Sequence, residues 1–81
     1  MEALEVVAHG DKSTSKVIGR MCAELVLPPG AMLAAVMRDK TLLSPHPELV
    51  ILPEDHVVIF LTERKSLRKV ERMFQVSATF F

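Results

Sequence analysis

Apolar runs mark four strands along the chain. Residues 31–37 are apolar without interruption, and the segment HVVIFL at residues 56–61 holds five more apolar residues in a row. Short continuous runs of this kind are typical of strands buried on both faces, although a buried helical segment has the same pattern. We predict strands at residues 4–8, 31–37 and 56–61, and a further short strand at residues 41–43. A tight reversal at residues 38–40 joins the middle two strands into a hairpin.

Two amphipathic helices are predicted where apolar residues recur at helical spacing. The first follows capping residues at 13–15, ends before Pro28 and contains Gly19, which costs about 1 kcal/mol of helix propensity. Its apolar face consists of Val17, Ile18, Met21, Cys22 and Leu25. The second helix follows a capping Ser66, and its apolar face consists of Leu67, Val70, Met73 and Phe74.

The order strand, helix, strand, strand, strand, helix defines the expected fold class. It predicts an α+β domain with a small mixed, mostly antiparallel sheet and two helices. Because both helices are short, we expect them to cover only one face of the sheet. The expected members of the core are Val36, Val58, Phe60, Ile18 and Leu25.

Apolar content is high for a chain of this length. Of the 81 residues, 49% are hydrophobic, and a domain this small has little interior in which to bury them. The strands are apolar on both sides, so the face without helices needs another cover. We therefore expect a two-fold homodimer. The alternative is a monomer with scattered exposed apolar side chains, which are common on protein surfaces.

The charge balance and residue types exclude several classes of protein. Ten basic and ten acidic residues give no net charge, and the chain has no Trp or Tyr, so we expect no nucleic-acid partner. A single Cys excludes a disulfide-stapled secreted scaffold. No apolar run reaches the ~18 residues of a membrane helix. Together these observations predict a cytoplasmic domain.

The sequence offers no recognisable metal or catalytic constellation. His9, His46 and His56 stand 37 and 10 residues apart, and Cys22 is isolated within an apolar pattern, whereas zinc ligands usually come in close pairs. The chain has three Gly in total, and no glycine-rich phosphate-binding loop is present. We therefore expect no metal, no cofactor and no enzymatic activity.

Two polar segments permit both a structural and a functional interpretation. The basic residues at 64–72 are interleaved with Glu63 and Glu71, and we interpret them as a solvated helix face rather than an anion site. The loop SPHP at residues 44–47 is interpreted as a structural loop. The alternative is the rim of a ligand pocket, because its prolines stiffen the chain beside an apolar strand.

The stretch from Lys16 to Leu61 resembles a known family, the C-terminal domains of regulators of potassium conductance, called TrkA-C or RCK-C. Members have a helix that opens with Gly and a basic residue and ends in Glu-Leu. A strand ending in Arg, a turn, a Pro, a Gly-Asp pair and a last apolar strand follow. The matching residues here are Gly19-Arg20, Glu24-Leu25, Arg38, Pro45 and Glu54-Asp55. The resemblance extends over residues 5–74, with Glu54 in place of the family's Gly.

This resemblance implies a single TrkA-C type domain over residues 1–81. Such a domain acts as a non-catalytic, ligand-sensing and dimerising part of a potassium-uptake regulator. Its expected partners are a second copy and, through a longer regulator, a membrane potassium-translocating subunit at the inner face of the cell membrane. The alternative is a small-molecule-binding regulatory domain of another cation transporter or antiporter.

The resemblance also bears on the ligand. Some members bind cyclic di-AMP through a basic residue after the first helix and an Asn at the start of the next strand. Here those positions are Pro28 and either Ala31 or Met32, so we expect no tight binding of cyclic di-AMP. A different small-molecule effector is expected near Leu27, Pro28, Met32, Pro45 and His46.

Overall fold

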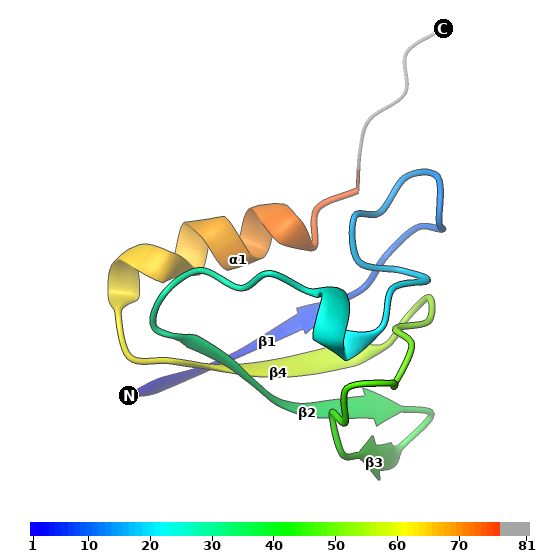
Figure 1. Cartoon of the computed structure of the whole chain (residues 1–81), viewed down its shortest axis with the longest axis horizontal. Coiled ribbons are helices and arrows are strands. Elements are labelled where there is room, and N and C mark those ends of the chain that lie inside the picture. The colour runs from blue at the N-terminus through cyan, green and yellow to red at the C-terminus, as the bar shows by residue number, and fades with distance from the viewer. Residues whose placement is uncertain (77–81) are drawn as a thin grey trace, which may run out of the picture.

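Four antiparallel strands form one sheet in the computed structural model, which describes residues 1–76 (Figure 1). The strands are β1 (Glu2–Val7), β2 (Ala31–Arg38), β3 (Thr41–Leu43) and β4 (His56–Leu61). Their order across the sheet is β1-β4-β2-β3, so the last strand of the sequence lies at the centre, between β1 and β2. All three strand pairs are antiparallel. The predicted strands and the α+β class are confirmed, and the sheet is wholly antiparallel rather than mixed.

The hairpin between β2 and β3 follows directly from its turn. Arg38 pairs with Thr41, which leaves Asp39 and Lys40 as a two-residue loop. Their φ angles are 48° and 66°, as a type I′ turn requires, and this turn matches the natural twist of the two strands. The predicted reversal at residues 38–40 is therefore confirmed.

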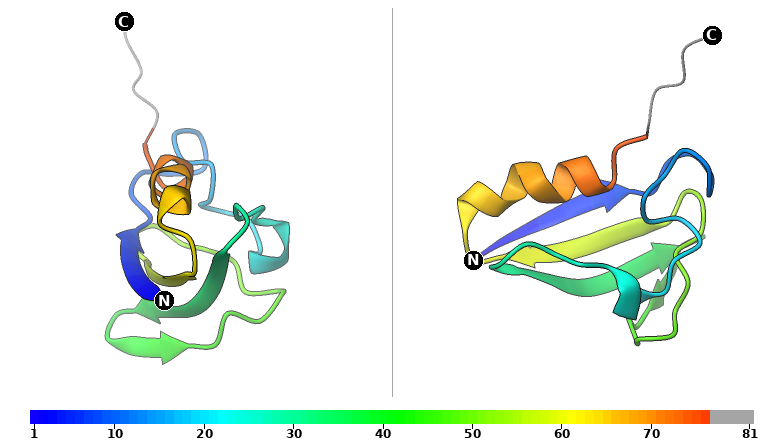
Figure 2. Two further views of the ribbon diagram at one scale, coloured as in Figure 1. Left: turned by 90° about the vertical axis from the view of Figure 1, so that its left-hand side faces the viewer. Right: turned by 45° about the horizontal axis from the view of Figure 1, so that its top comes forward.

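The helix α1 (Leu67–Met73), entered through the 3-10 turn η2 (Arg64–Ser66), covers one face of the sheet (Figure 2). The loop of residues 8–30 lies on the same side and shares its core. The buried apolar residues are Ala8, Val17, Ile18, Cys22, Val36, Ile51, Val57, Ile59, Leu61, Val70 and Phe74. Helix, loop and sheet thus make two layers around one core.

The predicted first helix is wrong. Residues 8–30 form a loop that contains only the 3-10 turn η1 (Cys22–Glu24), and Gly19 has a φ of 84°, which no α-helix admits. The backbone here pairs with a distant segment instead: Gly19 N–H donates to Ile51 O at 2.8 Å, and Cys22 N–H donates to Leu49 O at 2.8 Å. These tertiary bonds satisfy the donors that a helix would have satisfied locally.

The loop begins with a tight turn held by Asp11. Its Oδ1 accepts hydrogen bonds from the Ser13 hydroxyl at 2.7 Å, the Ser13 N–H at 2.9 Å and the Thr14 N–H at 3.1 Å. These bonds, led by the one from the Ser13 side chain, hold the pKa of Asp11 below its ordinary 3.8. The residues at 13–15 therefore belong to an Asp-capped turn and do not start a helix.

The alternation of side chains along β4 corrects part of the expected core. Val57, Ile59 and Leu61 point into the core, whereas Val58 and Phe60 are only half-buried because they lie on the other face. The expected burial of Val36 and Ile18 is confirmed. Leu25 is half-buried and packs against the core from its edge.

Within residues 1–76, no helix has the length and apolar character needed to cross a membrane.

Candidate functional site

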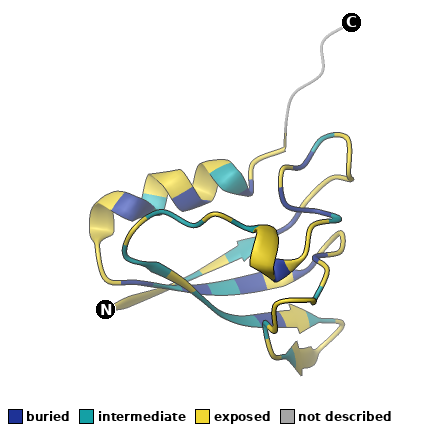
Figure 3. Cartoon of the chain, viewed as in Figure 1, coloured by how far each residue is buried: buried dark blue, intermediate teal, exposed yellow. Residues whose placement is uncertain are grey.

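The sheet face opposite α1 carries apolar side chains that no other element covers within residues 1–76. We call this surface the open face. Its residues are Met32, Ala35 and Met37 of β2, Leu42 of β3, and Val58 and Phe60 of β4. They adjoin because the register pairs Met32 with Phe60, Ala35 with Val58, and Met37 with Leu42. Met32 is 57% exposed and Leu42 is 66% exposed, and Figure 3 shows buried and half-buried positions alternating along β4.

A β-bulge sets which side chains reach the open face. Leu33 pairs with Ile59, but the next pair along is Ala35 with Val58, so Ala34 is the extra residue. The bulge allows Val36 to enter the core beside Val57 while Met37 returns to the open face. The sequence run at residues 31–37 has no alternation from which this assignment follows.

Charged residues border the open face along β1. His56 Nδ1 lies 2.7 Å from Glu5 Oε1 and links β4 to β1. Both side chains are largely exposed, so the pair adds little stability. Ala3 and Val7 lie on the same face of β1, on either side of Glu5, so the pair interrupts the apolar surface at β1.

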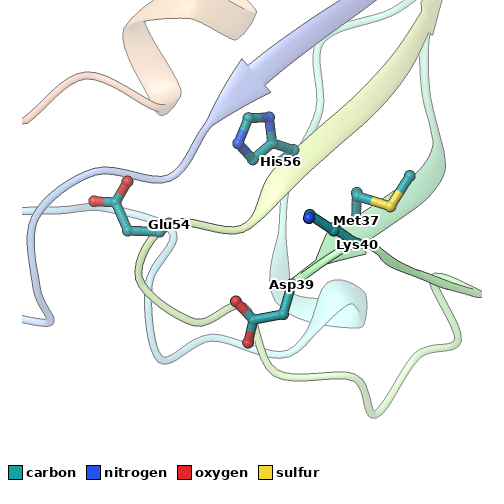
Figure 4. A pocket seen from close by; sticks show the side chains of 5 residues that line it. All are labelled: Met37, Asp39, Lys40, Glu54 and His56. Atoms are coloured by element: carbon teal, nitrogen blue, oxygen red, sulfur yellow. The ribbon is translucent and has the colours of Figure 1, made fainter.

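A hollow of about 580 Å³ lies at one end of the open face, lined by Met37, Asp39, Lys40, Glu54 and His56 (Figure 4). Met37 and His56 are cross-strand partners, and the other three residues come from the two turns next to them. In Figure 4 the His56 ring lies between Glu54 and the hairpin residues. Two carboxylates, one ammonium and one imidazole give the hollow a mixed charge, with no single sign that selects a ligand.

Within residues 1–76, the three non-glycine residues with positive φ all line this hollow. Besides Asp39 and Lys40, Glu54 has a φ of 68°, at the position where the family pattern has Gly. The turn closes with Asp55 N–H donating to Leu52 O at 3.2 Å. Glu54 thus keeps the left-handed conformation that a glycine favours, and the departure from the family pattern leaves this backbone conformation in place.

Beneath the hollow, Arg38 and Asp55 form a two-pronged ion pair on the covered face. Arg38 Nε donates to Asp55 Oδ1 at 2.9 Å, and its Nη2 donates to Asp55 Oδ2 at 2.8 Å and to Val50 O at 2.9 Å. Leu52 N–H also donates to Asp55 at 2.8 Å. The pair joins the end of β2 to the start of β4 and holds the segment between them.

Opposing effects act on the ionisation of this pair. Burial alone raises the pKa of Asp55, but the Arg38 hydrogen bonds, the Leu52 N–H and the Arg38 charge outweigh it, and the pKa lies below its ordinary 3.8. The hydrogen bond to Asp55 correspondingly raises the pKa of Arg38. Both groups are therefore charged at neutral pH, and the pair acts as a structural clamp.

The sequence placed Arg38 and Asp55 in a family pattern but did not predict that they pair. They lie 17 residues apart, and nothing in a single sequence links them. The available signal was positional: each stands at the end of an apolar strand, where an ionised side chain can reach across to the neighbouring strand's end.

The five predicted effector-site residues come from three segments of the chain. Leu27 and Pro28 precede the strand, Met32 is in it, and Pro45 and His46 leave β3. Since β3 pairs only with Val36–Arg38, residues 31–35 have a strand on one side alone within the described chain. Met32 is the member of the five that lies in this half of β2, and none of the five lines the hollow of Figure 4.

The described residues hold no group suited to metal chemistry. Within residues 1–76, no three side chains of His, Cys, Asp or Glu converge to hold a metal ion. Cys22 is buried, and burial raises the pKa of its thiol, which makes it a poor nucleophile at neutral pH.

Comparison with known proteins identifies the family of this chain. Residues 11–75 match the TrkA-C domain, and the chain belongs to that family. It is 45% identical over 80 residues to the Trk system potassium uptake protein TrkA of Halomonas elongata and 48% identical over 79 residues to TrkA of Vibrio alginolyticus. These matches span 99% and 98% of this chain, but only 18% and 17% of the two relatives.

A solved structure supports the fold independently. The RCK_C domain dimer of Streptococcus agalactiae BusR, solved in complex with cyclic di-AMP, superposes with a TM-score of 0.72. The match covers 91% of this chain and 96% of that one at 22% sequence identity. This likeness shows the fold alone. The expectation of one domain over residues 1–81 stays a prediction.

Proposed function

We propose that this TrkA-C domain is a non-catalytic dimerisation and regulatory module of a potassium-uptake regulator, and that two copies pair through the open face. The observation that carries the proposal is a sheet face whose apolar side chains no other element of residues 1–76 covers, whereas the opposite face packs against α1 and the loop of residues 8–30. Burial of apolar surface stabilises association by roughly 25 cal/mol per Å². A partner copy offers the same apolar chemistry by symmetry.

The size of the open face suits such an interface. It spans three strands. Of its most exposed members, Met32 lies near the start of β2, and Leu42 of β3 pairs with Met37 near the end of β2. A specific interface buries on the order of 1,600 Å² in total, about half from each partner. Methionine at two of the six positions also favours contact, because its flexible side chain adapts to a facing surface.

The first test is the mass of the chain in solution. We expect light scattering at micromolar concentration to give twice the chain mass of 9.0 kDa. The variant Met32→Glu/Leu42→Glu should give the monomer mass, because two charges would be buried without partners in each half of the interface. As a matched control, Leu52→Glu introduces a charge at a side chain that is 42% exposed but lies off the open face, and it should leave the dimer intact.

Two results would contradict this assignment. A mass of 9.0 kDa that does not change on concentration would exclude dimerisation. A dimer that survives Met32→Glu/Leu42→Glu but dissociates in Leu52→Glu would place the interface elsewhere and remove the open face from it.

We further propose that an effector binds at the unpaired half of β2, among Leu27, Pro28, Met32, Pro45 and His46. The support is that the first half of β2, which holds Met32, pairs with β4 on one side and with no strand on the other side within residues 1–76. Met32 belongs to both this group and the open face, so a ligand here would also affect pairing of the two copies. A ligand that binds one paired arrangement better than another shifts the population toward it.

Cyclic di-AMP is expected to bind this site weakly, because the phosphates find no cation at Pro28 and the base edges find no amide at Met32. Calorimetry should show no binding at micromolar affinity for the unmodified chain. Pro28→Arg/Met32→Asn should bind at least about tenfold more tightly, since a charge-assisted bond adds roughly 1.5–3 kcal/mol. Micromolar affinity in the unmodified chain would overturn the expectation.

A further inference from the structure

The basic residues of this protein are concentrated on one element. Five of the ten Lys and Arg residues lie within positions 64–72, together with only one of the ten acidic residues, Glu71. The segment therefore has a net charge of +4, and the rest of the chain has a net charge of −4. We call its five cations the basic stripe: Arg64, Lys65, Arg68, Lys69 and Arg72. A chain of zero net charge is thus strongly polarised.

The basic stripe is open to solvent along its whole length. All five side chains are exposed, and no other element of residues 1–76 lies on the side of α1 that faces away from the sheet (Figure 2). Within residues 1–76, Arg68, Lys69 and Arg72 form no ion pair. Arg68 and Arg72 stand one turn apart and, with Glu71 and Gln75, line a shallow hollow of about 450 Å³.

The apolar side of α1 is already occupied by the core. Val70 and Phe74 are buried, and Leu67 and Met73 pack against the core cluster. No apolar side chain of the helix is therefore left to insert into a hydrocarbon layer. Whatever the basic stripe contacts, the attraction is electrostatic and lies at a surface.

We propose that the basic stripe docks the domain on an anionic phospholipid surface, with α1 toward the bilayer and the open face directed away from it. A planar layer of headgroups suits long, flexible cations on one exposed element and demands no shape complementarity. The polarity of the chain orients it, because the acidic remainder is repelled from the same surface. The choice of a membrane rests on the proposed function, which puts the domain next to a membrane transport system.

A nucleic acid fits the same observations less well. Specific and non-specific nucleic-acid binding both rest on many phosphate contacts. The basic stripe offers only five cations, with Glu63 next to it and Glu71 within it. The described residues provide no exposed aromatic platform beside it for stacking on bases. Duplex DNA is accordingly the competitor to include in the test.

The experiment measures co-sedimentation of the chain with vesicles of phosphatidylcholine alone and of phosphatidylcholine mixed with phosphatidylglycerol. We expect binding to the mixed vesicles only, and its loss in about 1 M salt, where the screening length falls to roughly 3 Å. In Arg68→Gln/Lys69→Gln/Arg72→Gln the partition coefficient should fall about 100-fold, since each basic residue near an anionic surface contributes roughly a factor of five. Gln keeps a helix propensity close to those of Arg and Lys.

A matched control removes the same charge elsewhere. Lys12→Gln/Lys16→Gln/Lys40→Gln changes three exposed lysines outside the stripe and should retain most of the binding. Arg68→Lys/Arg72→Lys, which preserves charge, should also bind. Equal loss in the two triple variants, binding to phosphatidylcholine alone, or tighter binding to duplex DNA at the same salt would overturn the proposal. Light scattering of the same variants tests dimerisation separately, so failure of vesicle binding does not bear on the open face.

Discussion

Val57→Asp is expected to abolish cooperative folding, whereas Val58→Asp, one residue further along β4, is expected to leave the domain folded. Val57 is fully buried at the centre of the sheet beside Val36. An ionised carboxylate there would have no partner, and the cost of several kcal/mol approaches the whole stability of a small domain. Val58 lies on the open face, where a carboxylate remains solvated in the monomer.

Urea denaturation followed by circular dichroism distinguishes the two variants. Val58→Asp should unfold in one cooperative transition, weakened by up to about 1 kcal/mol because the new carboxylate faces Glu5 across the strand pair. Its mass should be that of the monomer, since Val58 belongs to the proposed interface. If Val57→Asp melts cooperatively, or if Val58→Asp is unfolded, then the assignment of core and open faces along β4 is wrong.

Arg38→Ala is expected to destabilise the domain by about 3–5 kcal/mol at pH 7, because it leaves a buried carboxylate without its partner. The Asp55 side chain is 1% exposed and that of Arg38 is 28% exposed. Removing the guanidinium takes two hydrogen bonds from Asp55 and one from Val50 O. The matched control is Arg20→Ala, which removes an exposed side chain whose hydrogen bond within residues 1–76 goes to Lys16 O, and it should change stability by less than about 0.5 kcal/mol.

The pH dependence of stability gives an independent readout of the same pair. In the unmodified domain the folded-state pKa of Asp55 is lowered, so its contribution is complete above the unfolded value near 4 and is lost as the pH falls through the folded value. In Arg38→Ala, burial is the largest effect that remains on Asp55, opposed by the Leu52 N–H; we expect it to raise the pKa of Asp55, so this variant regains stability as the pH falls from 7 toward 4. The difference between the two proteins should therefore shrink on acidification. A constant difference across this range would exclude an uncompensated carboxylate as the cause.

Local sequence signals were sufficient where structure depends on near neighbours. The strands and the last helix follow from apolar runs and helical spacing, and the hairpin follows from a short polar turn at Asp39 and Lys40 between two apolar strands. In each case the deciding interactions lie within a few residues. For the site, the sequence identified segments on either side of β2 and the family positions of Arg38 and Asp55, through resemblance rather than through chemistry visible in the residues themselves.

Long-range contacts decided the features that the sequence left undetermined or predicted wrongly. Residues 16–25 have helical periodicity, yet their backbone pairs with Leu49–Ile51, because a positive φ at Gly19 ends any helix there and brings the two segments together. In β4 every residue after His56 is apolar, so the pattern carries no information about which face is inside. Helix α1 and the loop of residues 8–30 occupy one face, and their packing makes Val57 and Ile59 core residues and leaves Val58 and Phe60 on the other face. The sequence by itself determined that this chain has more apolar surface than it can bury. Only the tertiary structure decided which face is left uncovered, because that choice depends on which side of the sheet the helix and loop cover.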